Sequence, residues 1–379
     1  MYLKLIWLSS TLFALFNFIG LLMPIKEPKK HKTKWLSVVF CIVSYGKNSE
    51  AIKRTIQAIK KYAGNLNYEI EVITDIALSE QMAGVKYLVV PNDYQTSKKA
   101  KYKARALHYG IEKRLAHQDK WVLHLDEESQ VKQDTIRGIK EFAKKHKSEN
   151  VIGQGAIYYN AYNYGQNALI TAIDSVRTGD DLGRFRTQYK LFKRPIFGLH
   201  GSFFFLNSVL EQAIGFDLGG KGSLTEDAYF ALKAMDMGIK FDWINGGLYE
   251  QSPYTLRDLI KQRRRWFNGL SITACDNVIS LRSRSCLLLS ICLWSLLPFS
   301  ILASVFNLIL PTDTPLWLSI ISGFNLAVIV SVYLVGAKKN GGSLIKTLLL
   351  FVPSACIEAY AIIYAIVRPV SGFQVVNKN

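Results

Sequence analysis

Hydrophobic residues gather at the two ends of the chain, on either side of a more polar stretch at about 24–284. Each of the four apolar runs has at least 21 residues, and only the last contains a charge; they cover 5–25, 286–310, 316–337 and 347–367. About 20 apolar residues cross the hydrocarbon core of a bilayer, so each run is a candidate span. The first run has no small-x-small cleavage site before Pro24, which favours a retained anchor over the alternative, a cleaved signal peptide.

Within the polar stretch, strand-like runs alternate with helical spacing. An almost unbroken apolar run with β-branched residues predicts a buried strand at 35–43, and further strands are predicted at 68–74, 85–90 and 121–125. Apolar residues three and four apart predict helices at 49–62 and 100–115. This alternation predicts an α/β domain with a mostly parallel sheet and a ligand at the carboxyl ends of its strands. Asp75 and Asp126 fall there, although each alone is equally typical of a turn or a helix cap.

Charge adds a second kind of segregation. The 379 residues include 47 Lys or Arg and 29 Asp or Glu, a net charge of +18, and 49% are hydrophobic, which excludes disordered and collagen-like chains. The basic excess lies in four stretches, 26–34, 98–120, 177–194 and 253–284. Basic residues beside apolar runs suit anionic lipid headgroups, and those inside a domain suit a phosphate-bearing ligand. Nucleic acid is disfavoured as a partner because no nucleic-acid-binding motif accompanies the charge. Five cysteines without paired spacing indicate neither a disulfide framework nor a zinc site.

The lysines near the apolar runs predict orientation. Five lysines lie in 26–34, against only Lys4 before the first run, and three more lie in the loop 338–346. The positive-inside rule therefore predicts an integral membrane protein whose central domain is cytoplasmic. Three simple crossings after that domain would leave the tail 368–379 outside, so a bent or re-entrant path through the last run, which contains Pro353 and Glu358, is the alternative.

Charged residues at the predicted strand ends suggest chemistry on a diphosphate. Asp126 and Glu128 are alternate carboxylates just past the fourth strand, a spacing that can hold a hard divalent cation on a diphosphate. The basic stretch 98–105 supplies cations for the same diphosphate, with Lys103 and Arg105 nearest the apolar face of the helix. A solvated helix face is the alternative interpretation of this stretch.

Two motifs lie further along the domain. Thr225-Glu226-Asp227 precedes an apolar helix, where an acidic residue suits either helix capping or general-base catalysis. In a helix predicted at 255–272, Gln262, Arg265 and Trp266 share one face, and a membrane-surface helix would also place Trp beside basic residues. We expect the two intervening arginines, Arg263 and Arg264, to point away and meet lipid phosphates.

The order of these motifs resembles the membrane-bound family 2 glycosyltransferases, to which cellulose and hyaluronan synthases belong. The matching residues are Thr74-Asp75, His124-Leu-Asp126-Glu-Glu128, Gly201-Ser202, Thr225-Glu226-Asp227 and Gln262-x-x-Arg265-Trp266. Longer strings resemble the egghead-type β-1,4-mannosyltransferases, which use GDP-mannose to extend a glucosylated lipid. Those strings are Lys103-Ala-Arg-Ala-Leu107, His124-Leu-Asp-Glu-Glu128, Gly153-Gln-Gly155, Asp180-Asp-x-Gly183, Phe192-x-x-Pro195 and Glu250-x-Ser-Pro253.

The resemblance implies a GT-A-like α/β domain with transmembrane helices at both ends and amphipathic interface helices, and it implies residue roles. Asp126 and Glu128 would hold Mg²⁺ or Mn²⁺, an Asp-x-Glu where the synthases have Asp-x-Asp. Asp227 would be the general base. The nucleotide-sugar donor would be bound by Asp75, Ser44, Lys103, Arg105, Gln262, Arg265 and Trp266.

The expected reaction is an inverting transfer in β-1,4 linkage, with GDP-mannose favoured as donor and a UDP-sugar possible. Its expected partners are membrane lipids and a lipid-linked, glycolipid or saccharide acceptor, and the oligomeric state stays open. One alternative is a processive UDP-sugar-dependent polysaccharide synthase. A second, of a different class, is a non-catalytic membrane scaffold that kept the fold.

The expected domains are an anchor at 1–25, a catalytic domain at 26–254, an interfacial helix at 255–284, transmembrane segments at 285–367 and a tail at 368–379. The tail, Gly372-Phe373-x-Val375-Val-x-Lys378, resembles the gating loop of cellulose synthases, with Val376 in place of Thr. Gating would require a cytoplasmic tail. An unrelated basic tail is the alternative.

Overall fold

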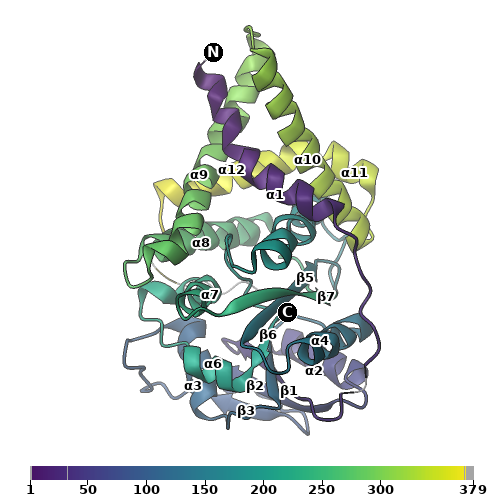
Figure 1. Cartoon of the computed structure of the whole chain (residues 1–379), viewed down its shortest axis with the longest axis vertical. Helices are drawn as coiled ribbons and strands as arrows, with labels where there is room; N and C mark the ends of the chain where they lie inside the picture. The colour runs from purple at the N-terminus through teal and green to yellow at the C-terminus, as the bar shows by residue number, and fades with distance from the viewer. Residues whose placement is uncertain (1, 32, 371, 373–379) are drawn as a thin grey trace.

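The computed structural model describes residues 2–31, 33–370 and 372. An α/β domain forms the broad base of the molecule, and apolar helices from both ends of the chain form its apex (Figure 1). The strands are β1 (Ser37–Ser44), β2 (Asn67–Thr74), β3 (Lys86–Val89), β4 (Lys120–Asp126), β5 (Val151–Tyr158), β6 (Phe204–Asn207) and β7 (Lys240–Tyr249).

The strands in the described residues form one sheet, in the order β3-β2-β1-β4-β6-β5-β7. The four strands expected from the sequence are β1 to β4, which pair in parallel, so the prediction of an α/β domain with a mostly parallel sheet is confirmed. β6 is antiparallel to both its neighbours, and only four residues long, which is why the hydrophobic pattern did not reveal it. In the parallel register Ser44 pairs with Thr74 and Val43 with Asp126, so the three strands end at one level.

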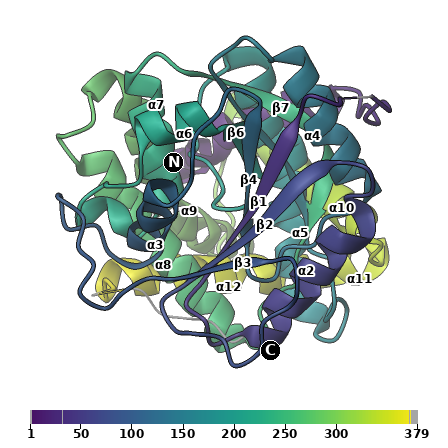
Figure 2. The same ribbon diagram turned by 90° about the horizontal axis from the view of Figure 1, so that it is seen from below.

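Helices cover both faces of this sheet (Figure 2). The α-helices of the domain are α2 (Ser49–Tyr62), α3 (Tyr102–Glu112), α4 (Gln133–Lys145), α5 (Ala168–Asp180), α6 (Ser208–Ile214), α7 (Glu226–Asp236) and α8 (Leu256–Cys275). The short 3₁₀-helix η4 (Lys221–Ser223) precedes α7. Two π-helical segments, η2 (Asp181–Phe185) and η3 (Gln188–Phe192), follow α5.

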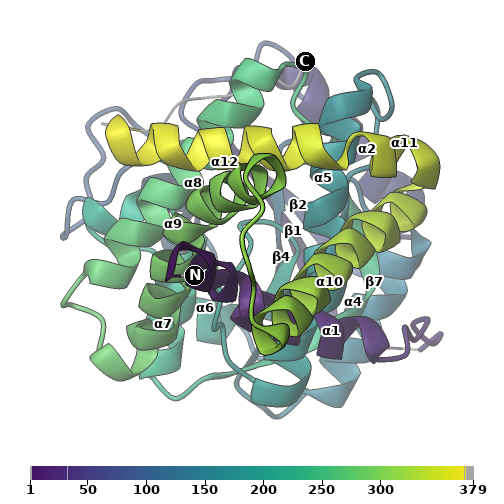
Figure 3. The same cartoon turned by 90° about the horizontal axis from the view of Figure 1, so that it is seen from above.

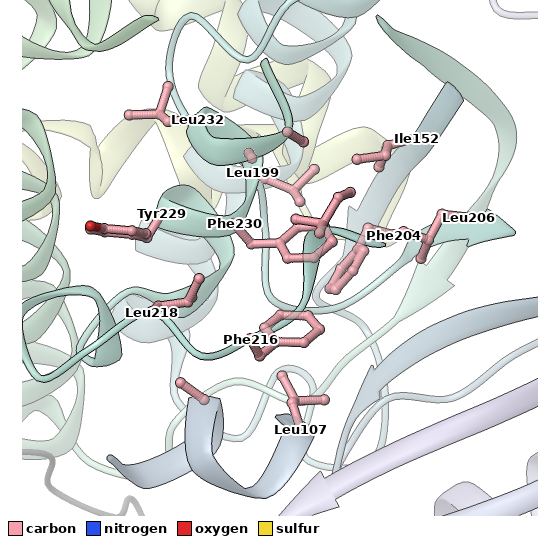
Figure 4. Packing of buried hydrophobic residues seen from close by; sticks show 14 of the residues in the cluster. Leu107, Ile152, Leu199, Phe204, Leu206, Phe216, Leu218, Tyr229, Phe230 and Leu232 are labelled. Atoms are coloured by element: carbon pink, nitrogen blue, oxygen red, sulfur yellow. The ribbon is translucent and has the colours of Figure 1, made fainter. Parts of the chain in front are cut away.

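Alternate side chains of β1 supply two cores, because successive residues of a strand point to opposite faces. Val38, Phe40 and Ile42 pack with α2 and α4, whereas Val39 and Val43 belong to the core under α3 and α7. In the second core, the rings of Phe216 and Phe230 stack with centroids 4.5 Å apart, and Leu107, Phe204 and Tyr229 surround them (Figure 4). This core fixes the start of α7 against the sheet.

The apolar ends form η1 (Tyr2–Ser10), α1 (Thr11–Leu22), α9 (Leu281–Ile309), α10 (Leu316–Asn340), α11 (Leu344–Leu349) and α12 (Phe351–Val367). Three of the described helical segments are long and apolar enough to cross a membrane: Leu3–Leu22, Leu281–Ile309 and Leu316–Asn340. The fourth expected run is divided between α11 and the 17-residue α12. α12 lies across the long axis of the molecule rather than along it (Figures 1 and 3).

α10 is joined to the α/β domain through glycines. An added Cβ at Gly336 would lie 1.8 Å from the Ser175 carbonyl oxygen, and one at Gly179 of α5 would lie 2.0 Å from the Val332 carbonyl oxygen. Small residues allow helix backbones to approach this closely. The contact therefore fixes a candidate membrane helix directly to the domain.

We expect Gly336→Ala to destabilise the protein, because the backbone of α5 has no room for the methyl group. Overpacking typically costs about 1–3 kcal/mol. Gly323→Ala is the matched control, since Gly323 lies in the same helix with nothing within 4 Å of an added Cβ. Thermal unfolding in detergent should give a lower midpoint for Gly336→Ala than for Gly323→Ala. Equal midpoints would show that α5 and α10 can separate without cost.

Candidate active site

The carboxyl ends of β1, β2 and β4 bring the expected donor-binding residues together. Asp75 follows β2 and forms an ion pair with Arg105 of α3, with 2.5 Å between carboxylate and guanidinium. Arg105 also donates a hydrogen bond to the Tyr94 carbonyl oxygen. The loop between β3 and α3 is therefore tied to the end of β2, and Asp75 and Arg105 lie side by side on the cavity wall.

Lys103 connects the two acidic motifs. Its ammonium lies 2.5 Å from Asp126, at the end of β4, and 3.3 Å from Glu226, at the start of α7. It also donates to the Gly201 carbonyl oxygen. Burial opposes the charge, but Asp126, Glu226 and Asp227 outweigh burial and raise the pKa of Lys103. A fixed positive charge thus lies between the Asp126 carboxylate and Asp227.

Glu127, between Asp126 and Glu128, is held by residues of β1, of α2 and of the turn between them. Ser44 and Asn48 both donate hydrogen bonds to the Glu127 carboxylate, and Thr55 donates to its carbonyl oxygen. Burial, then Glu128 and Asp126, raise the pKa of Glu127 to about 7. Ser44, expected at the donor, therefore holds Glu127 in this structure. The sequence interpretation assigned Glu127 no role, although its place between two candidate ligands was a usable signal.

Asp227 lies in the first turn of α7, where one carboxylate oxygen accepts from the Ala228 backbone N–H at 2.8 Å. Burial and the neighbouring Glu226 raise the pKa of Asp227 to about 7, against Lys103 and Arg265. Thr225 is the N-cap residue of α7, but its hydroxyl makes no capping hydrogen bond, and Glu226 and Asp227 lie in the first turn. A carboxyl group that titrates near neutrality and borders a cavity can accept a proton from a bound hydroxyl.

The expected face of α8 borders the same cavity. Gln262, Arg265 and Trp266 all line it. Arg265 donates to the Leu224 carbonyl oxygen at 3.0 Å, three residues before Asp227. The Trp266 ring lies 4.5 Å from the Arg177 guanidinium and 4.8 Å from that of Arg263. The Gln-x-x-Arg-Trp motif thus faces the start of α7 across the cavity.

The expectation that Arg263 meets lipid phosphates was wrong. Arg263 is 3% exposed and pairs with Glu358 of α12 at 2.7 Å and with Asp174 of α5 at 3.0 Å. It also donates to the Gln262 side-chain oxygen. Arg263 also borders the same cavity as Gln262 and Trp266, and the sequence could not show that acidic residues from two distant helices lie beside it. Arg264 donates to the carbonyl oxygens of Arg368 and Pro369.

Glu250 is a further acidic residue that the sequence interpretation left without a role. It is buried after β7, and its carboxylate accepts hydrogen bonds from Ser129 and Ser202. Burial, then Glu128 and Asp126, raise the pKa of Glu250 to about 7. The string Glu250-x-Ser-Pro253 was its only sequence signal.

This concentration of carboxylates fits a divalent cation. Among the described residues, no three His, Cys, Asp or Glu side chains are arranged as a complete metal site. Asp126 and Glu128 offer two hard oxygen ligands, and a diphosphate and water could complete the shell. Burial is the main cause of the raised pKa values of Glu127 and Glu250, and repulsion from Glu128 and Asp126 adds to it; a bound cation would relieve that repulsion.

One cavity of about 1780 Å³ connects these groups to the apolar helices at the apex. At one end it is bordered by the carboxylates and by α8. At the other end its walls are side chains of α9, α10 and α12, among them Leu297, Ile301, Val305, Leu326, Ile329 and Val352. The cavity is thus polar at one end and apolar at the other.

These features define a class: the fold is that of a GT-A glycosyltransferase. Residues 121–335 match the family model described as glycosyl transferase family group 2. The chain belongs to that family and is a glycosyltransferase.

Particular relatives cover most of the chain. It is 32% identical to β-1,4-mannosyltransferase egh of Drosophila melanogaster, over 97% of this chain and 84% of that protein. It is 34% identical to β-1,4-mannosyltransferase bre-3 of Caenorhabditis elegans, over 80% of this chain and 67% of that protein. Among solved structures, the mannosyltransferase PcManGT from Pyrobaculum calidifontis, in complex with GDP-Man and Mn²⁺, superposes with a TM-score of 0.51. That match covers 92% of this chain and 98% of PcManGT at 14% identity, and it supports the fold.

Proposed function

We propose that this protein transfers mannose from GDP-mannose to a lipid-linked acceptor, in β-1,4 linkage and with inversion, at the cytoplasmic face of a membrane. The observation that carries the lipid acceptor is the single cavity that joins the acidic groups to the membrane helices. The sugar and the linkage are inferred from the curated relatives, which are β-1,4-mannosyltransferases. The GDP-Man bound to PcManGT is consistent with this donor.

The proposed mechanism assigns one task to each group. Asp227 accepts the proton of the acceptor hydroxyl, whose oxygen attacks the anomeric carbon of the donor. Lys103 and Arg265, on either side of Asp227, hold the diphosphate and stabilise the negative charge that develops on the leaving nucleotide. Because a single displacement uses no enzyme nucleophile, an α-linked donor gives a β-linked product.

The remaining site residues support the donor. Asp75 binds the base or ribose, and Arg105 holds its carboxylate in place. Asp126 and Glu128 would hold Mg²⁺ or Mn²⁺, which would supply positive charge to offset the negative charge on the departing nucleotide. Ser44 acts through Glu127, next to these ligands. Gln262 and Trp266 border the acceptor sugar at the membrane side of the cavity.

A cytoplasmic domain is supported by the lysines of 26–34, which follow the first candidate span, and by those of 338–346, at and just after the end of α10. The transverse path of α12 favours a chain end on the same side as the domain (Figure 3). An added Cβ at Gly372 would lie 2.9 Å from the Tyr102 hydroxyl, beside Lys103. Of the proposed gating tail, Phe373, Val375, Val376 and Lys378 lie outside the described residues. The proposed domains are an anchor at 1–25, a catalytic domain at 26–254, an interfacial helix at 255–284, transmembrane segments at 285–367 and a tail at 368–379.

Transfer from GDP-mannose is the first experiment. Membranes containing the protein should incorporate radiolabel from GDP-mannose into lipid, and little from UDP-glucose or UDP-GlcNAc. EDTA should abolish incorporation and Mn²⁺ or Mg²⁺ should restore it, because two carboxylates alone cannot hold the diphosphate against charge repulsion. Incorporation from UDP-sugars alone would overturn the donor assignment. A labelled polymer instead of a one-sugar extension would favour the processive synthase.

A further inference from the structure

The motif Asp180-Asp-x-Gly183 lies where α5 passes into the π-helical segment η2, between the active site and α1. Asp180 accepts a hydrogen bond from Asn17 of α1 at 2.9 Å. Gly183 is in contact with the same helix, since an added Cβ would lie 2.1 Å from the Asn17 side-chain oxygen. Asp180 and Gly183 therefore fix α1, but they leave the function of Asp181 unexplained.

Asp181 holds His200. One carboxylate oxygen accepts from the Ile157 backbone N–H at 2.8 Å, which fixes the buried side chain to β5. The other lies 2.6 Å from Nε2 of His200. The Phe185 ring packs on the imidazole with centroids 4.3 Å apart. The imidazole is thus fixed on one edge and one face.

The free edge of His200 faces the cavity. The His200 side chain is 26% exposed and lines the cavity, and within the described residues Nδ1 makes no hydrogen bond. Three other described histidines pair with carboxylates, His108, His124 and His146, and none of them lines this cavity. If the His200–Asp181 pair served only stability, His200 would not need to border the cavity.

The position of His200 places it next to the reacting groups. The following residue, Gly201, accepts a hydrogen bond from Lys103, and an added Cβ there would lie 3.2 Å from an Asp227 carboxylate oxygen. On its other side, Phe185 contacts Phe197, which packs on Phe13 of α1. His200 therefore lies between the proposed base and a candidate membrane helix, where the head of a lipid-linked acceptor would pass.

We propose that His200 binds a hydroxyl group of the acceptor sugar and that Asp181 is its positioning residue. With Nε2 donating to Asp181, Nδ1 of the neutral ring can accept a hydrogen bond from a hexose hydroxyl. This orients the sugar so that another hydroxyl faces Asp227. The inference rests on the proposed function, because it takes the acceptor to be a sugar.

Binding and transfer are measured separately on the full chain in lipid nanodiscs. The binding probe is octyl β-glucoside below its micelle concentration, titrated without donor, and GDP-mannose is titrated in parallel. His200→Ala should weaken octyl glucoside binding at least tenfold and leave the affinity for GDP-mannose within twofold. Asp181→Asn should weaken octyl glucoside binding at least threefold. His200→Asn should restore part of the binding, because its side-chain oxygen can replace Nδ1.

His108→Ala is the matched control, a carboxylate-paired histidine away from the cavity, and should change neither affinity. The proposal is overturned if the parent chain does not bind octyl glucoside, or if His200→Ala binds it as tightly as the parent. It is also overturned if His200→Ala loses GDP-mannose affinity to the same extent. A parent chain that shows the expected binding pattern but transfers no mannose would contradict the proposed function while supporting the role of His200.

Discussion

Asp227→Asn should lose nearly all sugar transfer while retaining its affinity for GDP-mannose. The amide keeps the size and the hydrogen bond to Ala228 but cannot accept the proton of the attacking hydroxyl. Removing a general base typically costs about 10²–10⁴ in rate. Initial rates of mannose transfer, measured beside GDP-mannose titrations, separate this loss from a loss of donor binding. A non-catalytic scaffold would keep its function in this variant.

The pH profile gives an independent test of the same group. Burial and Glu226 raise the pKa of Asp227 to about 7, so the carboxylate form that accepts a proton is lost as the pH falls through that value. We therefore expect kcat/KM of the parent to decline on the acidic side of neutrality. Asp236→Asn, at the far end of α7, is the control and should retain both rate and profile. Unchanged activity of Asp227→Asn would mean that another group accepts the proton.

The fold could be predicted from the sequence because its information is local. β1 is an apolar run rich in β-branched residues, β2 to β4 are segments with several apolar residues each, and α2 and α3 have helical spacing. The antiparallel β6 and the π-helical segment η2 carry no such periodicity. They depend on contacts with distant residues, such as the pairing of β6 with β4 and of Asp181 with His200.

In the candidate site, too, residues placed by local pattern could be predicted, whereas contacts between distant residues could not. Asp75, Asp126 and Asp227 follow strands or begin a helix, so local pattern sufficed to propose them. Lys103 joins two acidic motifs that are 100 residues apart in the numbering, at Asp126 and Glu226, and no spacing rule shows such a bridge. The same applies to Arg263, whose partners come from α5 and α12. Sequence thus reveals the groups at strand ends but not the ion pairs that position them.

Buried ion pairs are also where the largest loss of stability is expected. Arg263, Asp174 and Glu358 join α8, α5 and α12; Arg263 and Asp174 are buried, and Glu358 is 19% exposed at the cavity. Burial alone would raise the pKa of Asp174, but Arg177 and Arg263 outweigh it and hold that pKa below its usual range. Asp174 and Arg263 are therefore both charged, and each charge is stabilised by the other.

Arg263→Met should destabilise the protein by about 3–5 kcal/mol, the usual cost of breaking a buried pair from one side. Methionine nearly fills the volume but removes the ion-pair partner of Glu358 and one of the two arginines that pair with Asp174. Arg264→Met is the matched control, because the Arg264 guanidinium bonds to the carbonyl oxygens of the exposed residues Arg368 and Pro369 and lies on the Tyr364 ring, and it forms no ion pair within the described residues. Thermal unfolding in detergent measures the stability of Arg263→Met against that of Arg264→Met. Adding Asp174→Asn and Glu358→Gln to Arg263→Met should recover part of the lost stability, because the two carboxylates that Arg263 had paired with are then uncharged. If Arg263→Met were as stable as Arg264→Met, water would have to reach this cluster, and α12 would not be held to α8 through charge.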